Sequence, residues 1–131
     1  MFVDASALCA MLTSEDDAHE LLARLQHAPR RVTSPLAVWE TTVSVARILG
    51  LPLDETTKAV EEYLELIGIE TLGVPAEAAA SAIDAFSRYG KGRHPAALNF
   101  GDCFAYACAR YYKMPLLFKG NDFPQTDIEP A

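Results

Sequence analysis

Four acidic side chains, spread along the sequence, have the types and settings of a metal-dependent catalytic site. They are Asp4 in MFVDASAL, Glu40 in SPLAVWE, Asp102 in NFGDCFAYACA and Asp122 in LLFKGNDF. The only Lys or Arg close to any of them along the chain is Lys119. Carboxylates gathered without a base repel one another, so at least one pKa must rise unless cations bind between them. Oxygen-only ligands suit Mg²⁺ or Mn²⁺.

One or two such ions can bind phosphate oxygens, activate water and stabilise a leaving oxygen. The four acids together therefore predict phosphodiester hydrolysis. Taken singly, each acid has a simpler interpretation. Asp4 ends a strand, Glu40 complements a helix dipole, Asp102 starts a helix and Asp122 lies in a turn. Other catalytic schemes are not supported, because the chain has no GxSxG, no HExxH and no glycine-rich phosphate loop.

Ser6 and the segment around Asp122 supply polar groups close to the acids. Ser6 lies two residues after Asp4, where its hydroxyl either contacts a metal-bound water or a phosphate, or caps the local turn. Asn121, beside Asp122, is a further candidate substrate contact. A phosphatase-type aspartate nucleophile is disfavoured, because Ser6 replaces the second aspartate of that pattern.

The elements that must position these residues alternate between strand and helix. Strands are predicted at residues 2–5, 31–33, 69–74 and 116–118, with a short edge strand around Asp127. Helices are predicted from Ser14 through Leu25, from Pro35 to Gly50, over 52–67, from Pro75 to Gly90 and from Gly101 to Tyr112. This order predicts an α/β fold, a three-layer α/β/α sandwich around a central, mainly parallel sheet of four to five strands. Its site is expected where the strands end.

Length and composition narrow the class of protein. The 131 residues predict a single domain spanning 1–131, with half of them apolar. No apolar run is long enough to cross a membrane, and no basic stretch opens a signal peptide. Three cysteines without CxxC spacing favour a reducing, cytoplasmic location. The net charge of −7 weakens a nuclease interpretation, since nucleic-acid binders usually carry a basic face.

With these motifs in this order and at these separations, the chain resembles a PIN domain, and more closely a VapC-type toxin ribonuclease of a type II toxin–antitoxin pair. The motifs are the hydrophobic-Asp-Ala-Ser opening, the helix with Glu40, the GDCFAYACA helix and the LLFKGNDF strand and turn. The resemblance extends from Phe2 to about Ile128. It implies a PIN-like sandwich, RNA cleavage dependent on Mg²⁺ (or Mn²⁺), a homodimer, and inhibition by a cognate VapB-like antitoxin that covers the acidic groove.

The resemblance also implies roles for the acids. Asp4 and Asp102 match the principal metal ligands, and Glu40 matches the acid that binds metal directly or through water. Asp122 matches the region of the fourth acid, with Asp127 as its alternative. Many relatives have Thr-x-Asp after the fourth strand, where this chain has Phe-Lys-Gly from residue 118, so the fourth ligand and the number of metals stay open.

Two further choices stay open. The loop RYGKGRH concentrates basic residues, and Lys91 and Arg93 either steer RNA toward Asp102 or belong to an ordinary exposed loop. The function is either a metal-dependent endoribonuclease or, as the alternative, a catalytically weak PIN-like module that binds RNA or a protein. Three of the expected acids match their motifs, which favours the enzyme.

Overall fold

A four-stranded, entirely parallel sheet forms the centre of the molecule. The computed structural model describes residues 1–131. Its strands are β1 (Phe2–Val3), β2 (Val32–Thr33), β3 (Glu70–Thr71) and β4 (Leu116–Leu117), in the order β3-β2-β1-β4. β1 lies between β2 and β4, with Phe2 in register with Val32 on one side and Leu116 on the other.

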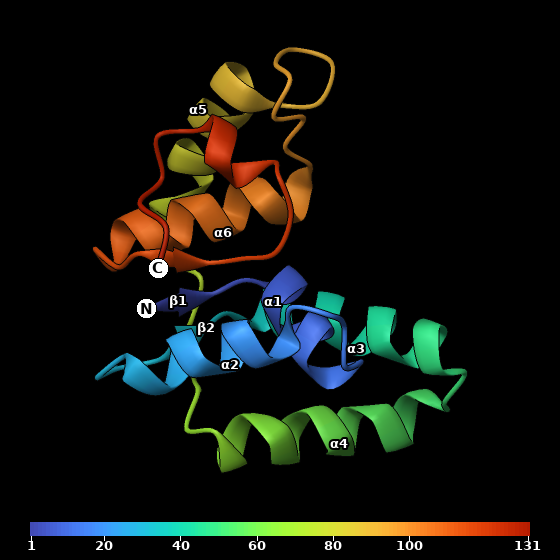
Figure 1. The fold of residues 1–131 in the computed structure, drawn as a ribbon. Coiled ribbons are helices and arrows are strands. Elements are labelled where there is room, and N and C mark those ends of the chain that lie inside the picture. The colour runs from blue at the N-terminus through green and yellow to red at the C-terminus, as the bar shows by residue number, and fades with distance from the viewer.

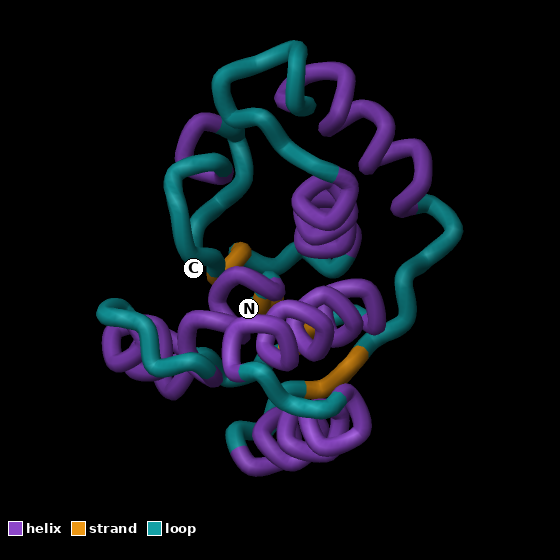
Figure 2. Tube along the Cα trace, turned by 90° about the vertical axis from the view of Figure 1, so that its right-hand side faces the viewer, coloured by secondary structure: helices purple, strands orange, loops and turns teal.

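Helices cover both faces of this sheet and complete three layers. They are α1 (Ala5–Leu12), α2 (Ala18–His27), α3 (Pro35–Leu49), α4 (Leu53–Leu66), α5 (Ala78–Tyr89) and α6 (Phe100–Tyr111), with a short 3₁₀ helix η1 (Phe123–Gln125). Figures 1 and 2 show α5 and α6 on one face, α1, α2 and α4 on the other, and α3 packed beside α1 and α4. The predicted α/β/α sandwich with a parallel sheet is confirmed. None of the helices combines the length and apolar character needed to span a membrane.

The two faces of the sheet bury separate hydrophobic clusters. Side chains alternate along a strand, so Phe2 and Leu116 pack with α5 and α6, whereas Val3 and Leu117 pack with α1, α2 and α4. Strands buried on both faces are expected in a parallel sheet. Each of β1 and β4 is only two residues long, and both residues of each strand are fully buried.

The first helix was not predicted from the sequence. The chain turns directly from β1 into α1, and Asp4 is the N-cap residue of that helix instead of a strand residue. The segment ASALCAML is apolar nearly all round, so it lacks the 3.6-residue pattern on which the prediction relied. The prediction that Ser14 caps the next helix was also wrong: Ser14 has a φ of 54° in the α1–α2 turn, and α2 begins at Ala18.

Some predicted boundaries also differ. The strand predicted over 69–74 is limited to Glu70–Thr71, and the Pro75 helix begins at Ala78. The tail around Asp127 is not a strand; it makes a single parallel bridge, between Leu116 and Pro130. The α3 helix follows its prediction, because Ser34 accepts the Ala37 N–H at 3.2 Å and Gly50 ends the helix with a φ of 64°.

Candidate active site

Asp4 is fixed where β1 passes into α1. It is only 4% exposed, and its Oδ2 accepts the Ser6 backbone N–H at 3.0 Å and the Ser6 hydroxyl at 2.6 Å. Ser6 Oγ in turn accepts the Lys119 backbone N–H at 3.0 Å, which ties this corner to the segment after β4. Both bonds to Asp4 reach the same carboxylate oxygen. The Ala5 backbone N–H adds a further interaction that lowers the pKa of this carboxylate.

Glu40 reaches the same region from the second turn of α3. A Cβ atom built on Gly101 would overlap both carboxylate oxygens of Glu40, so this carboxylate lies directly against the first turn of α6. Glu40 forms no hydrogen bond and no ion pair through its side chain. Figure 1 shows that the carboxyl end of β1 and the N-terminal end of α6 lie on the same side of the molecule.

Asp102 belongs to the first turn of α6 and is half-buried. Its Oδ2 accepts the Asn99 N–H at 3.0 Å, while Asn99 Oδ1 accepts the Asp102 N–H at 2.9 Å. This reciprocal pair is a capping box, which satisfies two N–H groups at the start of the helix. The other oxygen of Asp102 has no hydrogen-bond partner.

The electrostatics show that these carboxylates share one environment. Burial, followed by the charges of Asp4 and Asp102, raises the pKa of Glu40 to about 7. Burial is also the main reason that the pKa of Asp102 rises to about 6, and the charges of Asp4 and Asp122 contribute. Burial raises the pKa of Asp4 against the hydrogen bonds from Ser6. No Lys, Arg or His forms an ion pair with any of these acids, so a neutralising charge must come from outside the chain.

Asp122 lies at the edge of this group. It is exposed in the turn before η1, and its charge is felt at Asp102. Asn121 is exposed beside it. Asp127, the alternative fourth acid, is committed elsewhere: Tyr106 Oη donates to it at 2.5 Å and Arg88 Nη2 at 3.0 Å. The placement therefore favours Asp122 over Asp127.

The donor set fits a hard divalent cation in its chemistry. It consists of carboxylate oxygens without a neutralising base, and Asp102 keeps one oxygen that accepts no hydrogen bond. The side chains do not already form a ligand set, since no three acids, histidines or cysteines of the chain are grouped closely enough to hold an ion. Binding would therefore draw Glu40 and Asp102 toward the fixed Asp4.

The candidate substrate contacts differ in how they are placed. The Ser6 hydroxyl donates to Asp4, the N-cap residue of α1, and accepts the Lys119 N–H, so both of these bonds lie within the protein. Lys91 and Arg93 are exposed in the loop between α5 and α6. That loop is closed by the bridge between Gly90 and Leu98, and the Arg93 guanidinium lies 5.5 Å from the centre of the Phe86 ring.

Sequence reasoning missed two residues of this site. Asn99 holds Asp102 through the capping box, and its spacing Asn-x-x-Asp is a signal that could have found it. Gly101 makes room for Glu40, but a contact between helices that are far apart in the sequence leaves no local signal.

Comparison with known proteins agrees with this arrangement. The model of the PIN domain family matches residues 1–129. The chain belongs to the PIN-domain family. Among its relatives within this PIN family, ribonuclease VapC30 of Mycobacterium tuberculosis is 39% identical over 128 residues, covering 98% of this chain and 95% of that protein. Ribonuclease VapC of Mycolicibacterium smegmatis is 40% identical, covering 98% and 97%.

A solved structure supports the PIN fold as well. The crystal structure of VapC20 of Mycobacterium tuberculosis, described as a sarcin–ricin loop cleaving toxin, superposes with a TM-score of 0.76. The match covers 99% of this chain and 97% of that one at 21% identity, which establishes a common fold. The resemblance to VapC-type PIN proteins predicted from the four motifs is thus confirmed.

Proposed function

We propose that this PIN domain is a metal-dependent endoribonuclease, the toxin of a type II toxin–antitoxin pair of the VapC type. The observation that carries the proposal is the group of carboxylates at the ends of β1 and β4 and on α3 and α6, which share one environment without a protein cation. The relatives named VapC ribonucleases support the same assignment, since they match almost the whole chain. The cytoplasm is the proposed location.

Asp4, Glu40 and Asp102 would hold Mg²⁺, or Mn²⁺, with Asp122 as the fourth acid. When bound, such an ion supplies Lewis acidity toward a phosphate oxygen and toward the attacking water. Asp4 provides the fixed ligand, because the Ser6 hydrogen bonds hold its side chain. Glu40, which lies against the first turn of α6, would bind the ion directly or through water and help to orient that water.

RNA would approach over the α5–α6 loop. Lys91 and Arg93 are exposed there, and neither forms an ion pair with an acid of the chain. Both can therefore attract phosphates toward Asp102 and offset the net charge of −7 locally. Asn121 and Ser6 complete the proposed substrate contacts. While the Ser6 hydroxyl keeps its hydrogen bonds to Asp4 and to the Lys119 N–H, it acts by holding Asp4.

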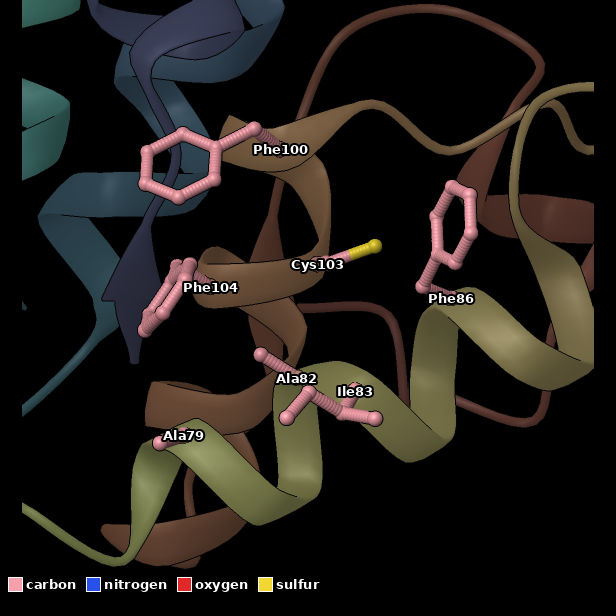
Figure 3. A pocket seen from close by; sticks show the side chains of 7 residues that line it. All are labelled: Ala79, Ala82, Ile83, Phe86, Phe100, Cys103 and Phe104. Atoms are coloured by element: carbon pink, nitrogen blue, oxygen red, sulfur yellow. The ribbon is translucent and has the colours of Figure 1, made fainter.

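Two protein partners are proposed. A VapB-like antitoxin would cover the acid group with basic side chains, since burial and neighbouring acids leave Glu40 and Asp102 without a cation of the chain. A second copy of the chain would cover the apolar groove between α5 and α6, which has a volume of about 400 Å³. Figure 3 shows the residues that line it, with Ile83 and Phe86 on α5, Phe100, Cys103 and Phe104 on α6, and the Cys103 side chain pointing toward Phe86. Ile83 and Phe100 are 70% and 69% exposed, which favours burial in a homodimer.

The test is cleavage of RNA by the purified, antitoxin-free protein. It is incubated with total cellular RNA in Mg²⁺ or in EDTA, beside an Asp4→Asn variant. Discrete fragments that require metal and disappear in the variant are expected. A folded protein that binds RNA without metal-dependent cleavage would instead support the alternative, a catalytically weak PIN-like binding module.

A further inference from the structure

Gly101 occupies a position where the backbone does not require glycine. It is the second residue of α6 and is buried, and its φ lies outside the left-handed region. A glycine inside a helix is less favourable than an alanine. What distinguishes the position is the space that a side chain would fill, because a Cβ there would overlap the Glu40 carboxylate.

We propose that Gly101 is a positioning residue for the metal site: its missing side chain lets Glu40 cross from α3 to the first turn of α6, beside Asp102. This inference rests on the proposed function. The Glu40 side chain makes no hydrogen bond and no ion pair, so the shape of its surroundings sets its position. Gly101 is the part of that surface that α6 contributes.

The first turn of α6 has little freedom to move away from Glu40. On the side facing α5, Cys103 and Phe104 line the apolar groove, and Figure 3 shows the Cys103 side chain directed toward Phe86. The capping box with Asn99 fixes the start of the helix. A methyl group at position 101 would therefore displace the flexible end of Glu40 and leave the helix in place.

We therefore expect Gly101→Ala to keep or gain stability while it loses affinity for metal. Gly101→Ala favours the helix by removing backbone freedom from the unfolded chain, yet it moves a metal ligand. A glycine that served only folding would give the opposite result, with lower stability on substitution. The variant should remain folded while its affinity for metal falls.

The experiment is a double-mutant cycle of Gly101→Ala and Glu40→Ala, measured on the full chain with Mn²⁺ alone as the probe. Calorimetric titration should show a loss of Mn²⁺ affinity of about 10- to 100-fold for Gly101→Ala. In the Glu40→Ala background the same substitution should cause no further loss. RNA cleavage in Mg²⁺ should follow the same pattern.

Thermal unfolding in EDTA gives a second readout that does not depend on metal. Gly101→Ala should raise the Tm by about 3 °C when Glu40 is already alanine, and by less when Glu40 is present, because the methyl group must then displace it. Gly73→Ala, between β3 and α5, is the control for removing a glycine that faces no side chain, since a Cβ there meets no atom within 4 Å and its φ lies outside the left-handed region.

The outcomes separate the two proposals. Equal Tm gains in both backgrounds, or Mn²⁺ affinity unchanged by Gly101→Ala, would overturn the role of Gly101 while the nuclease assignment stands. A wild-type chain that binds no Mn²⁺ and cleaves no RNA would overturn the proposed function, and the positioning role with it. Unequal Tm gains would then still identify the contact between Glu40 and Gly101 as one of packing.

Discussion

Two aspartates at opposite ends of α6 have opposite environments: Asp102 belongs to its first turn, and Asp127 contacts Tyr106 and Arg110 of the same helix. Asp127 comes from the C-terminal tail and accepts hydrogen bonds from Tyr106 at 2.5 Å and Arg88 at 3.0 Å. Arg110 adds a second cation at 3.8 Å. The Tyr106 bond, followed by those of the arginine, lowers the pKa of Asp127. This carboxylate is neutralised by the protein itself.

Asp102, in the first turn of the helix, accepts one hydrogen bond, from the Asn99 N–H, and forms no ion pair. Burial and neighbouring acids raise its pKa to about 6, and the Asn99 hydrogen bond opposes that rise. The two aspartates therefore have different roles. A carboxylate with its own arginines fastens a segment of the fold, whereas one held beside other acids is stabilised only when a cation arrives from solution.

The largest expected effect is the loss of activity in Asp102→Asn. An asparagine keeps the shape and can still accept the Asn99 N–H through its side-chain oxygen, so the capping box survives. It removes the charge that would bind metal, and RNA cleavage in Mg²⁺ should fall at least about 100-fold. Initial rates on a defined RNA, with circular dichroism as the check on folding, measure this.

Asp127→Asn is the matched control for that loss. It makes the same chemical change at the other end of α6, and cleavage should remain within about twofold of the wild-type rate, since the residue lies outside the acid group. Equal losses in the two variants would mean that the distinction between them is wrong.

The second effect in size is the stability of the Asp127→Asn variant itself. Asparagine accepts weaker bonds from Tyr106 and Arg88 than a carboxylate does, so unfolding in urea should require about 1–2 kcal/mol less free energy. The value stays modest because both ends of the Arg88–Asp127 ion pair are 42% exposed. Asp102→Asn should not lose stability at pH 8, because it removes repulsion. A loss there as large as in Asp127→Asn would contradict the comparison.

The candidate acids can be selected from the sequence because their signals are local. Asp4 follows an apolar strand, Asp102 starts an apolar helix, and Glu40 follows the Ser34–Pro35 helix start, so parallel topology alone brings them to one edge of the sheet. It could not decide between Asp122 and Asp127, because that depends on which one the arginines reach across the fold.

The fold, like the site, was predicted where the sequence pattern is local and missed where distant contacts decide the structure. Alternating strands and helices gave the sandwich, but α1 was missed since a helix buried on almost every side carries no amphipathic period. The segment around Asp127 suggested an edge strand, whereas its hydrogen bonds to α5 and α6 side chains hold it as a loop. Long-range contacts of this kind override local preference.

The third prediction concerns the pH dependence of the metal-free protein. Glu40 and Asp102 have folded-state pKa values raised to about 7 and about 6. A raised pKa gives stability that is full below the unfolded pKa of about 4 and is lost as pH rises through 6 to 7. In EDTA, the free energy of unfolding should therefore fall by about 1–2 kcal/mol between pH 5 and pH 8 because of these groups, a value discounted for partial exposure.

Glu40→Gln isolates this contribution, because it removes one titrating group at constant size. The loss of stability between pH 5 and pH 8, measured by urea unfolding, should be smaller in the variant than in the wild type. Asp127 does not interfere, since a lowered pKa acts below this window. Mg²⁺ at pH 8 should restore stability to the wild type. A wild type whose stability in EDTA falls no more steeply than that of Glu40→Gln would show that folding does not raise the pKa of Glu40.

The weakest effect on activity should come from the basic loop between α5 and α6. Arg88 is engaged by Asp127, whereas Lys91 and Arg93 are exposed without an acidic partner. Replacing both with alanine should raise KM for RNA about threefold to tenfold and leave kcat nearly unchanged, because they attract phosphates without touching the reacting group. The difference from wild type should shrink as salt rises from about 50 to 200 mM, since screening removes the same attraction. A change confined to kcat, or one independent of salt, would instead place the two residues at the reacting phosphate or in the packing of the loop.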